Sequence, residues 1–305
     1  MTENKVTVKA PGKLMILGEH AVLYGYSCLV TAVNKYLTVE ASLTEGGKDE
    51  IMTPQSSDQT FIRQTLAFFR PVAKSNKCFR IKTESEITGY GLGSSCATVV
   101  ATIKALAYLL KINFTEQKLF DICFRIILNV QKKASGFDIA SCIYGGNILF
   151  SGRTKKADKI SSNPLPLSVV FTGVKADTKT MIEKMAETRS KDPQKTDEIF
   201  QEIDHIVKIG QQAILEKKWQ ALGLLMNQNQ TLLKDLGVST SGIDRLVEVA
   251  LKNGAYGAKL SGAGGGDCII VLANADERSR IEDALQKAGG EIISLSTSVE
   301  GAKIT

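Results

Sequence analysis

A glycine-rich stretch between a strand pattern and a helix pattern constrains the fold of this chain more than any other feature. Residues 87–97 read ITGYGLGSSCA and follow the alternating run 78–83. After them, apolar residues recur at helical spacing: Val99, Val100, Ile103, Leu106, Ala107 and Leu110. Glycines let a backbone turn tightly and approach an anion, and the first turn of a helix offers unpaired N–H groups. The spacing predicts either a phosphate-binding loop or a tight strand-to-helix turn.

The stretch differs from the two best-known phosphate-binding patterns. No Gly-Lys-Ser/Thr follows its glycines, so it is not a Walker A loop. It does not lie at a first strand-to-helix turn, as a dinucleotide-binding motif does. Ser94 and Ser95 add hydroxyl groups that suit a phosphate or a metal ion.

Two further stretches combine glycines with charged residues. Residues 10–20, APGKLMILGEH, follow an expected strand at 5–9 and bring a lysine, a carboxylate and an imidazole together. Taken alone, they are equally consistent with a surface loop that holds a salt bridge. Residues 259–268, KLSGAGGGDC, place three consecutive glycines before an apolar strand. That pattern suits a phosphate-facing loop or a packing contact between two lobes.

The length of 305 residues favours two lobes. The polar segment 151–168 contains two prolines, so we expect a division into residues 1–155 and 156–305. Residues 45–60 are predicted to form an exposed loop. Other patterns predict strands at 35–41, 78–83 and 167–172 and helices at 115–130, 197–216 and 275–289.

Composition excludes several classes of function. The net charge of +6 comes from basic and acidic residues that are interspersed, so no nucleic-acid partner is expected. The chain has two histidines and six cysteines without a CxxC pair, which argues against a zinc site. The cysteines fit small core residues in a reducing compartment. No signal peptide and no membrane-length apolar run occurs, so we expect a cytoplasmic protein with no membrane partner.

Together and in this order, the three stretches resemble the GHMP kinases, and the resemblance covers essentially the whole chain. It implies an α+β fold of two lobes, an N-terminal one like the second domain of ribosomal protein S5 and a C-terminal ferredoxin-like one. It also implies that ATP, Mg²⁺ and a small-molecule acceptor meet in the cleft between the lobes. The sequence leaves open whether the protein is a monomer or a homodimer.

Within that family, the first motif, APGKLMILGEHAVLYG, is similar to mevalonate kinases. This similarity implies phosphorylation of the mevalonate hydroxyl to 5-phosphomevalonate, in isoprenoid precursor biosynthesis. The SGFD at residues 135–138 and the GDC at 266–268 look more like phosphomevalonate kinases. A phosphomevalonate acceptor is therefore an alternative, and a non-catalytic binding protein of the same fold is another.

The resemblance also implies residue roles. Asp138 and Lys13 would be catalytic, although without the resemblance Asp138 is better explained as a helix cap near Gly136. Ser95 and Glu19 would hold the metal, yet residues 125–131 lack the metal-binding glutamate that mevalonate kinases carry there. The acceptor would contact His20, Glu19 and Gly264. The nucleotide would be bound by Gly89, Gly91, Leu92, Gly93, Ser94, Ser95 and Cys96.

Overall fold

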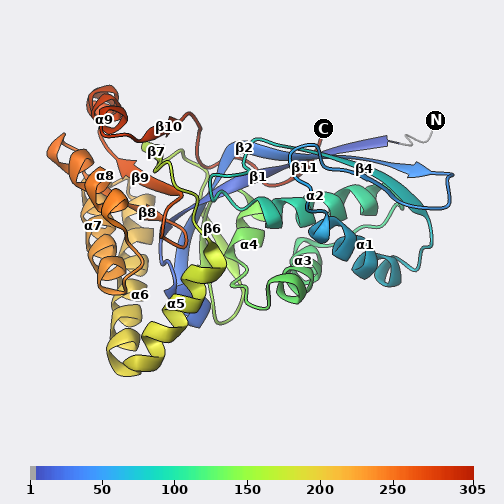
Figure 1. Ribbon diagram of the computed structural model, residues 1–305, viewed down its shortest axis with the longest axis horizontal. Coiled ribbons are helices and arrows are strands. Elements are labelled where there is room, and N and C mark those ends of the chain that lie inside the picture. The colour runs from blue at the N-terminus through green and yellow to red at the C-terminus, as the bar shows by residue number, and fades with distance from the viewer. Residues whose placement is uncertain (1–4) are drawn as a thin grey trace.

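The computed structural model describes residues 5–305 and has two sheets side by side, each covered by helices (Figure 1). The first sheet has the order β11-β1-β2-β4-β3, and β5 pairs with both β2 and β6. Its strands are β1 (Lys5–Leu17), β2 (Ser27–Thr44), β3 (Glu50–Met52), β4 (Cys78–Ser85), β5 (Asn147–Ser151), β6 (Ala157–Ser161) and β11 (Lys303–Ile304).

Four α-helices cover one face of the first sheet (Figure 1). They are α1 (Thr60–Ala73), α2 (Ser94–Leu109), α3 (Glu116–Gln131) and α4 (Phe137–Tyr144). Helix α2 packs against β1 and β2 on one side and against α1, α3 and α4 on the other. Because it is enclosed on both sides, its apolar residues run all round the helix rather than along one stripe. This enclosure fixes the position of its first turn.

The second sheet has the order β10-β7-β9-β8. Its strands are β7 (Leu167–Phe171), β8 (Gly257–Ser261), β9 (Cys268–Leu272) and β10 (Glu291–Ile293). The remaining helices are α5 (Thr178–Lys191), α6 (Pro193–Leu215), α7 (Trp219–Asp235), α8 (Ser241–Lys252) and α9 (Ala275–Lys287), with a short 3₁₀ helix, η1 (Ala21–Tyr24). Helix α6 also packs against β1 and β2, so it joins the two parts.

Most predicted elements are confirmed, with two corrections. The first strand runs to Leu17 instead of residue 9, so residues 10–17 of the second glycine-containing motif lie within β1, and all of residues 10–20 are buried. The surface-loop interpretation of that motif is therefore wrong. Pro11 and Gly12 do not end the strand, because the pairing of β1 with β2 absorbs them as a shift in register. The predicted loop at 45–60 contains the short strand β3, which pairs in parallel with β4.

The C-terminal segment returns to the first sheet. Strand β11 pairs with β1, and β6 pairs with β5, although both follow residue 155 in sequence. Strand β7, at the predicted start of the second lobe, pairs with β9 and β10. The division at 155 and 156 stays a prediction, and sheet pairing crosses it in both places.

The cysteines are unpaired thiols, and most of them lie inside the fold. All six cysteines are free, and all except the half-buried Cys78 are buried. Within residues 5–305, no three acidic, histidine or cysteine side chains come together as a metal site would need. No helix in that range combines the length and apolar character needed to cross a bilayer.

Candidate active site

A cavity of about 350 Å³ lies where the two sheets meet, and the three glycine-rich stretches all reach it. Its wall combines the end of β1, the loop before α2, the start of α4, the segment before α5 and the loop between β8 and β9. Ten of the predicted site residues line it: Lys13, Glu19, His20, Gly89, Gly91, Gly93, Ser94, Ser95, Cys96 and Asp138. The structure therefore brings together side chains that are far apart in sequence.

Lys13 lies at the centre of this constellation. Its ammonium is 3.3 Å from Oδ1 of Asp138 and donates a hydrogen bond of 3.1 Å to the carbonyl of Gly91. Its backbone N–H donates to the carbonyl of Leu92. Because β1 is buried on both faces at this point, packing restricts the side chain of Lys13 on its way to the loop. The side chain of Lys13 is 9% exposed, so its charge acts where little water screens it.

Asp138 lies in the first turn of α4 and does not cap it. The capping position belongs to Gly136, and no side chain within residues 5–305 caps this helix. The carboxylate of Asp138 instead pairs with Lys13 and is 26% exposed toward the cavity. A carboxylate that is both accessible and paired with a cation can accept a proton from a bound hydroxyl group.

The loop before α2 has the geometry of an anion site. Helix α2 begins at Ser94 after Gly93, which has a left-handed φ of 86°. Within residues 5–305, the backbone N–H groups of Ser94, Ser95 and Cys96 have no hydrogen-bond partner. A Cβ atom at position 93 would lie 3.2 Å from Cγ of Lys13, a tight contact, and the left-handed backbone at this position also favours glycine. Free amides at a helix start attract phosphate.

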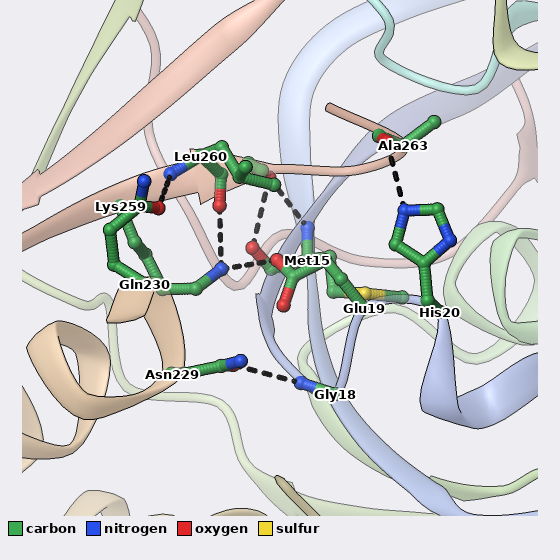
Figure 2. Close-up of polar contacts among 10 residues, drawn as sticks. Met15, Gly18, Glu19, His20, Asn229, Gln230, Lys259, Leu260 and Ala263 are labelled. Carbon is green, nitrogen blue, oxygen red and sulfur yellow. Dashed lines mark hydrogen bonds and ion pairs between the residues drawn. The ribbon is translucent and has the colours of Figure 1, made fainter. Parts of the chain in front are cut away.

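The opposite wall is a polar seam between β1 and the second part of the molecule (Figure 2). We use "the seam" for Met15, Gly18, Glu19 and His20 together with their partners Ser261, Asn229, Lys259 and Ala263. Met15 exchanges two backbone hydrogen bonds with the hydroxyl of Ser261, and the N–H of Gly18 donates to Asn229. The seam thus fastens the end of β1 to β8 and α7.

Glu19 and Lys259 form an ion pair whose side chains are both 0% exposed. Burial raises the pKa of Glu19 and lowers that of Lys259, while the attraction between their charges acts against both shifts. Lys259 also donates to the carbonyl of Leu260. The second oxygen of Glu19, Oε2, is buried without a partner among the described residues.

His20 is oriented by the other end of the seam. Its Nε2 lies 2.9 Å from the carbonyl of Ala263, so Nε2 carries the hydrogen and Nδ1 is left as an acceptor. Burial lowers the pKa of His20, which keeps the ring neutral. Nδ1 is buried without a partner within residues 5–305, on a residue that lines the cavity. The backbone of His20 has the unusual φ of 60°, which the surrounding contacts must hold.

Three of the predicted site residues lie in surroundings other than those that their predicted roles would require. Figure 2 shows Glu19 directed toward Lys259, away from His20, and its carboxylate is fully covered. The predicted role of Glu19 as a metal ligand stays a prediction, because Oε1 is paired with Lys259 whereas Oε2 has no partner among the described residues. Leu92 is buried, and its carbonyl orients Lys13. Gly264 lies outside the cavity wall, where it packs against the carbonyl of Val238.

Sequence reasoning gave no role to two charged residues in the third glycine-rich stretch, Lys259 and Asp267. Asp267 lines the cavity, and Lys259 is the buried partner of Glu19. A signal for Lys259 was present, since a lysine inside an apolar strand pattern needs a counter-ion. Lys175, Ala176 and Thr178, from the segment around the start of α5, also line the cavity.

A free helix start, a lysine and an accessible carboxylate around one cavity are the parts that phosphoryl transfer to a small molecule requires. Fold and cavity together define a two-lobe α+β small-molecule kinase. Sequence comparison gives the family: residues 60–146 match the GHMP kinases N terminal domain, and residues 211–291 match the GHMP kinases C terminal domain. The chain belongs to the GHMP kinase family, whose members use ATP.

Curated relatives extend the match over nearly the full chain. The mevalonate kinase of Thermococcus sibiricus is 31% identical, and the alignment covers 98% of both chains. The mevalonate kinase of Archaeoglobus fulgidus is 34% identical over 86% of this chain and 90% of that one. The crystal structure of L. major mevalonate kinase in complex with R-mevalonate superposes with a TM-score of 0.81 at 25% identity, covering 96% of this chain and 95% of that chain.

Proposed function

We propose that the protein transfers the γ-phosphoryl group of ATP to the hydroxyl of mevalonate, giving 5-phosphomevalonate for isoprenoid precursor synthesis. One observation carries the proposal: Lys13 contacts both the carboxylate of Asp138 and the carbonyl of Gly91, beside the free amides at the start of α2. A phosphate bound at those amides and a hydroxyl bound at Asp138 would both lie close to one ammonium group. The names of the relatives support mevalonate as the acceptor.

The proposed mechanism assigns a step to each group. Asp138 accepts the proton of the acceptor hydroxyl while its oxygen attacks the γ-phosphorus, and the bond from that phosphorus to the departing ADP breaks. Lys13 offsets the negative charge that builds up on the transferring group. The loop 89–96 orients the donor phosphates through backbone amides.

Two groups complete the acceptor and metal sites. Nδ1 of His20 is an acceptor without a partner among residues 5–305, so it suits a hydroxyl of the acceptor. Mg²⁺ supplies charge neutralisation on the phosphates when it is bound, and the hydroxyl of Ser95 is a suitable oxygen ligand for it.

Phosphomevalonate is the second candidate acceptor. The SGFD sequence at 135–138 favours it, and Lys133 and Lys175 line the cavity, where they are available to a phosphate. Mevalonate needs fewer cations, since it carries only a carboxylate. The two candidates therefore differ in how strongly turnover depends on those two lysines.

A panel of acceptors tests the proposal. Purified protein is incubated with ATP and Mg²⁺ and with mevalonate, phosphomevalonate, galactose or homoserine, and ADP release and the phosphorylated product are measured. Turnover of mevalonate to 5-phosphomevalonate is the expected result. Turnover of phosphomevalonate alone would move the assignment to the second candidate. Absence of phosphoryl transfer to every acceptor would favour a non-catalytic binding protein.

A further inference from the structure

Asp267 connects the two sides of the cavity at the start of β9. Its backbone N–H donates to the carbonyl of Val174, and its carbonyl accepts from the N–H of Thr172. Its φ of 54° is left-handed, a conformation that aspartate tolerates better than most residues. These contacts hold the residue rigidly beside the segment that leads into α5.

The two carboxylate oxygens of Asp267 have different surroundings. Oδ1 accepts a hydrogen bond of 3.0 Å from the N–H of Ala176. Oδ2 has no hydrogen-bond partner among the described residues, and it lies directly against Gly91 of the loop before α2. Any side chain at position 91 would collide with this carboxylate, so Gly91 leaves it room at the phosphate loop.

Asp267 is the acid at the cavity that lacks a cation in direct contact. Glu19 is paired with Lys259 and Asp138 with Lys13, whereas no ion pair to Asp267 exists within residues 5–305. Burial raises the pKa of Asp267, and the hydrogen bond from Ala176 and the more distant charges of Lys13 and Lys175 only partly oppose this. A carboxylate at a phosphate-binding loop repels the phosphates unless a cation lies between them.

We propose that Asp267 is a protein ligand of the divalent cation that accompanies the nucleotide phosphates. This inference rests on the proposed ATP-dependent function and adds a residue to it. Mg²⁺ is commonly bound by one or two carboxylates together with phosphate oxygens, and the segment 125–131 supplies none. Oδ2 of Asp267 is a free carboxylate oxygen at the loop, and Ser95 lines the same cavity. The second lobe thereby contributes to metal binding.

A purely structural role would have different consequences. In that case, Asp267 would only hold the segment 174–176 through its bond to Ala176, and the cation would be bound elsewhere. Asp267→Asn separates the two, because an asparagine oxygen can keep the bond to Ala176 while the negative charge is lost. Loss of the charge should weaken binding of the metal complex and relieve repulsion of the metal-free nucleotide.

The experiment measures ATP binding by calorimetry, with Mg²⁺ present or removed by EDTA, for the wild type and Asp267→Asn. The factor by which Mg²⁺ raises ATP affinity should fall by about tenfold in Asp267→Asn. Affinity for metal-free ATP should be unchanged or higher. An equal loss under both conditions, or an unchanged Mg²⁺ factor, would overturn the proposal.

Two controls complete the test. Asp276→Asn removes an exposed carboxylate from α9, away from the cavity, and should leave the Mg²⁺ factor as in the wild type. If Asp267→Asn does not fold, Asp267→Gly replaces it, since glycine accepts the left-handed backbone. Binding of Mn²⁺ to the ADP complex, followed by electron paramagnetic resonance, should weaken in either variant. A wild type that binds no adenine nucleotide would contradict the proposed function itself, whereas an unchanged Mg²⁺ factor contradicts only the role of Asp267.

Discussion

The two walls of the cavity differ in whether their charged groups are buried or accessible. In the seam, Glu19 and Lys259 are fully covered and bonded to each other. We call the opposite side the phosphate wall, and it consists of residues 88–96 with Lys13 and Asp138. Its charges reach the cavity, and the amides at the start of α2 have no partner among the described residues. Both walls contain a lysine and a carboxylate, so burial rather than composition distinguishes them.

The difference separates positioning from chemistry. A buried ion pair gains little net stability, because removing two charges from water costs about as much as their attraction returns. Its geometry is nevertheless specific, since any displacement leaves a charge uncompensated. Groups that accept a proton or bind phosphate must instead stay accessible and keep bonding capacity free. The seam therefore suits orientation of His20 and the end of β1, and the phosphate wall suits turnover.

The largest effect is expected from a substitution in the phosphate wall, at Asp138. Asp138→Asn removes the group that accepts the hydroxyl proton but preserves the shape of α4, so kcat should fall by as much as about 10⁴-fold. ATP should still bind, because the free amides of α2 are untouched. Steady-state kinetics and calorimetry measure the two quantities. Asp158→Asn, on an exposed position of β6, is the matched control, and wild-type turnover in Asp138→Asn would remove this residue from catalysis.

The next largest effect is expected from a substitution in the seam that lowers the stability of the protein. Lys259→Met leaves the Glu19 carboxylate buried without its counter-ion, and the free energy of unfolding should fall by about 3–5 kcal/mol. Adding Glu19→Gln should recover much of this loss, because both charges are then gone. Denaturant unfolding measures the three proteins. Lys252→Met breaks an exposed pair with Glu248 and should change stability little. A similar small loss in Lys259→Met would show that the seam tolerates an unpaired charge.

The fold was predictable wherever local periodicity determines it, as in α2 and α6. Prediction failed where pairing is non-local. Strand β3 has three residues, and β11 has two, so neither contains a period that a sequence pattern reveals. The end of β1 was missed for a different reason: Pro11 and Gly12 suggest a turn, whereas the neighbouring β2 lets the strand continue through them.

In the candidate site, too, local motifs could be recognised from the sequence, whereas a non-local contact could not. Lys13, Asp138 and the glycine loop come from motifs that a family resemblance makes visible. The bond between Glu19 and Lys259 joins residues 240 positions apart, and no pattern on either strand identifies the partner. The sequence assigned Glu19 to a metal, and it could not show that Lys259 neutralises the charge of Glu19 inside the protein. Burial of Glu19 and its pairing with Lys259 depend on the assembled fold, so the sequence alone could not reveal them.

A smaller effect tests whether the seam acts on the acceptor alone. His20→Ala removes the unpartnered Nδ1, so the KM of the acceptor should rise by about tenfold, the value of one hydrogen bond. The KM of ATP should stay within error, because the phosphate wall does not include this ring. His205→Ala, at an exposed position of α6, provides the control. An unchanged acceptor KM would exclude His20 from the acceptor site.

The smallest effect is a pH dependence that belongs to the seam. Burial lowers the pKa of His20 in the folded protein, whereas the unfolded chain has the ordinary value of about 6.5. Below that pH the unfolded state binds the proton first, so stability should fall as pH decreases, by at most about 1.4 kcal/mol per pH unit. His20→Gln should lack this part of the slope, and His205→Gln should retain it.

Comparing the pH dependence of stability among the three proteins isolates the contribution of His20. The raised pKa of Glu19 gives a slope of opposite sign, but Glu19 is present in all three proteins and its contribution cancels. Thermal unfolding between pH 5 and about pH 8 covers the window in which the unfolded histidine titrates. Equal slopes in the wild type and His20→Gln would mean that the imidazole takes up its proton in the fold at the same pH as in the unfolded chain, and is therefore charged below that pH. In that case its ring would donate at both nitrogens, and the acceptor group facing Nδ1 would have to be an oxygen lone pair rather than a hydroxyl hydrogen.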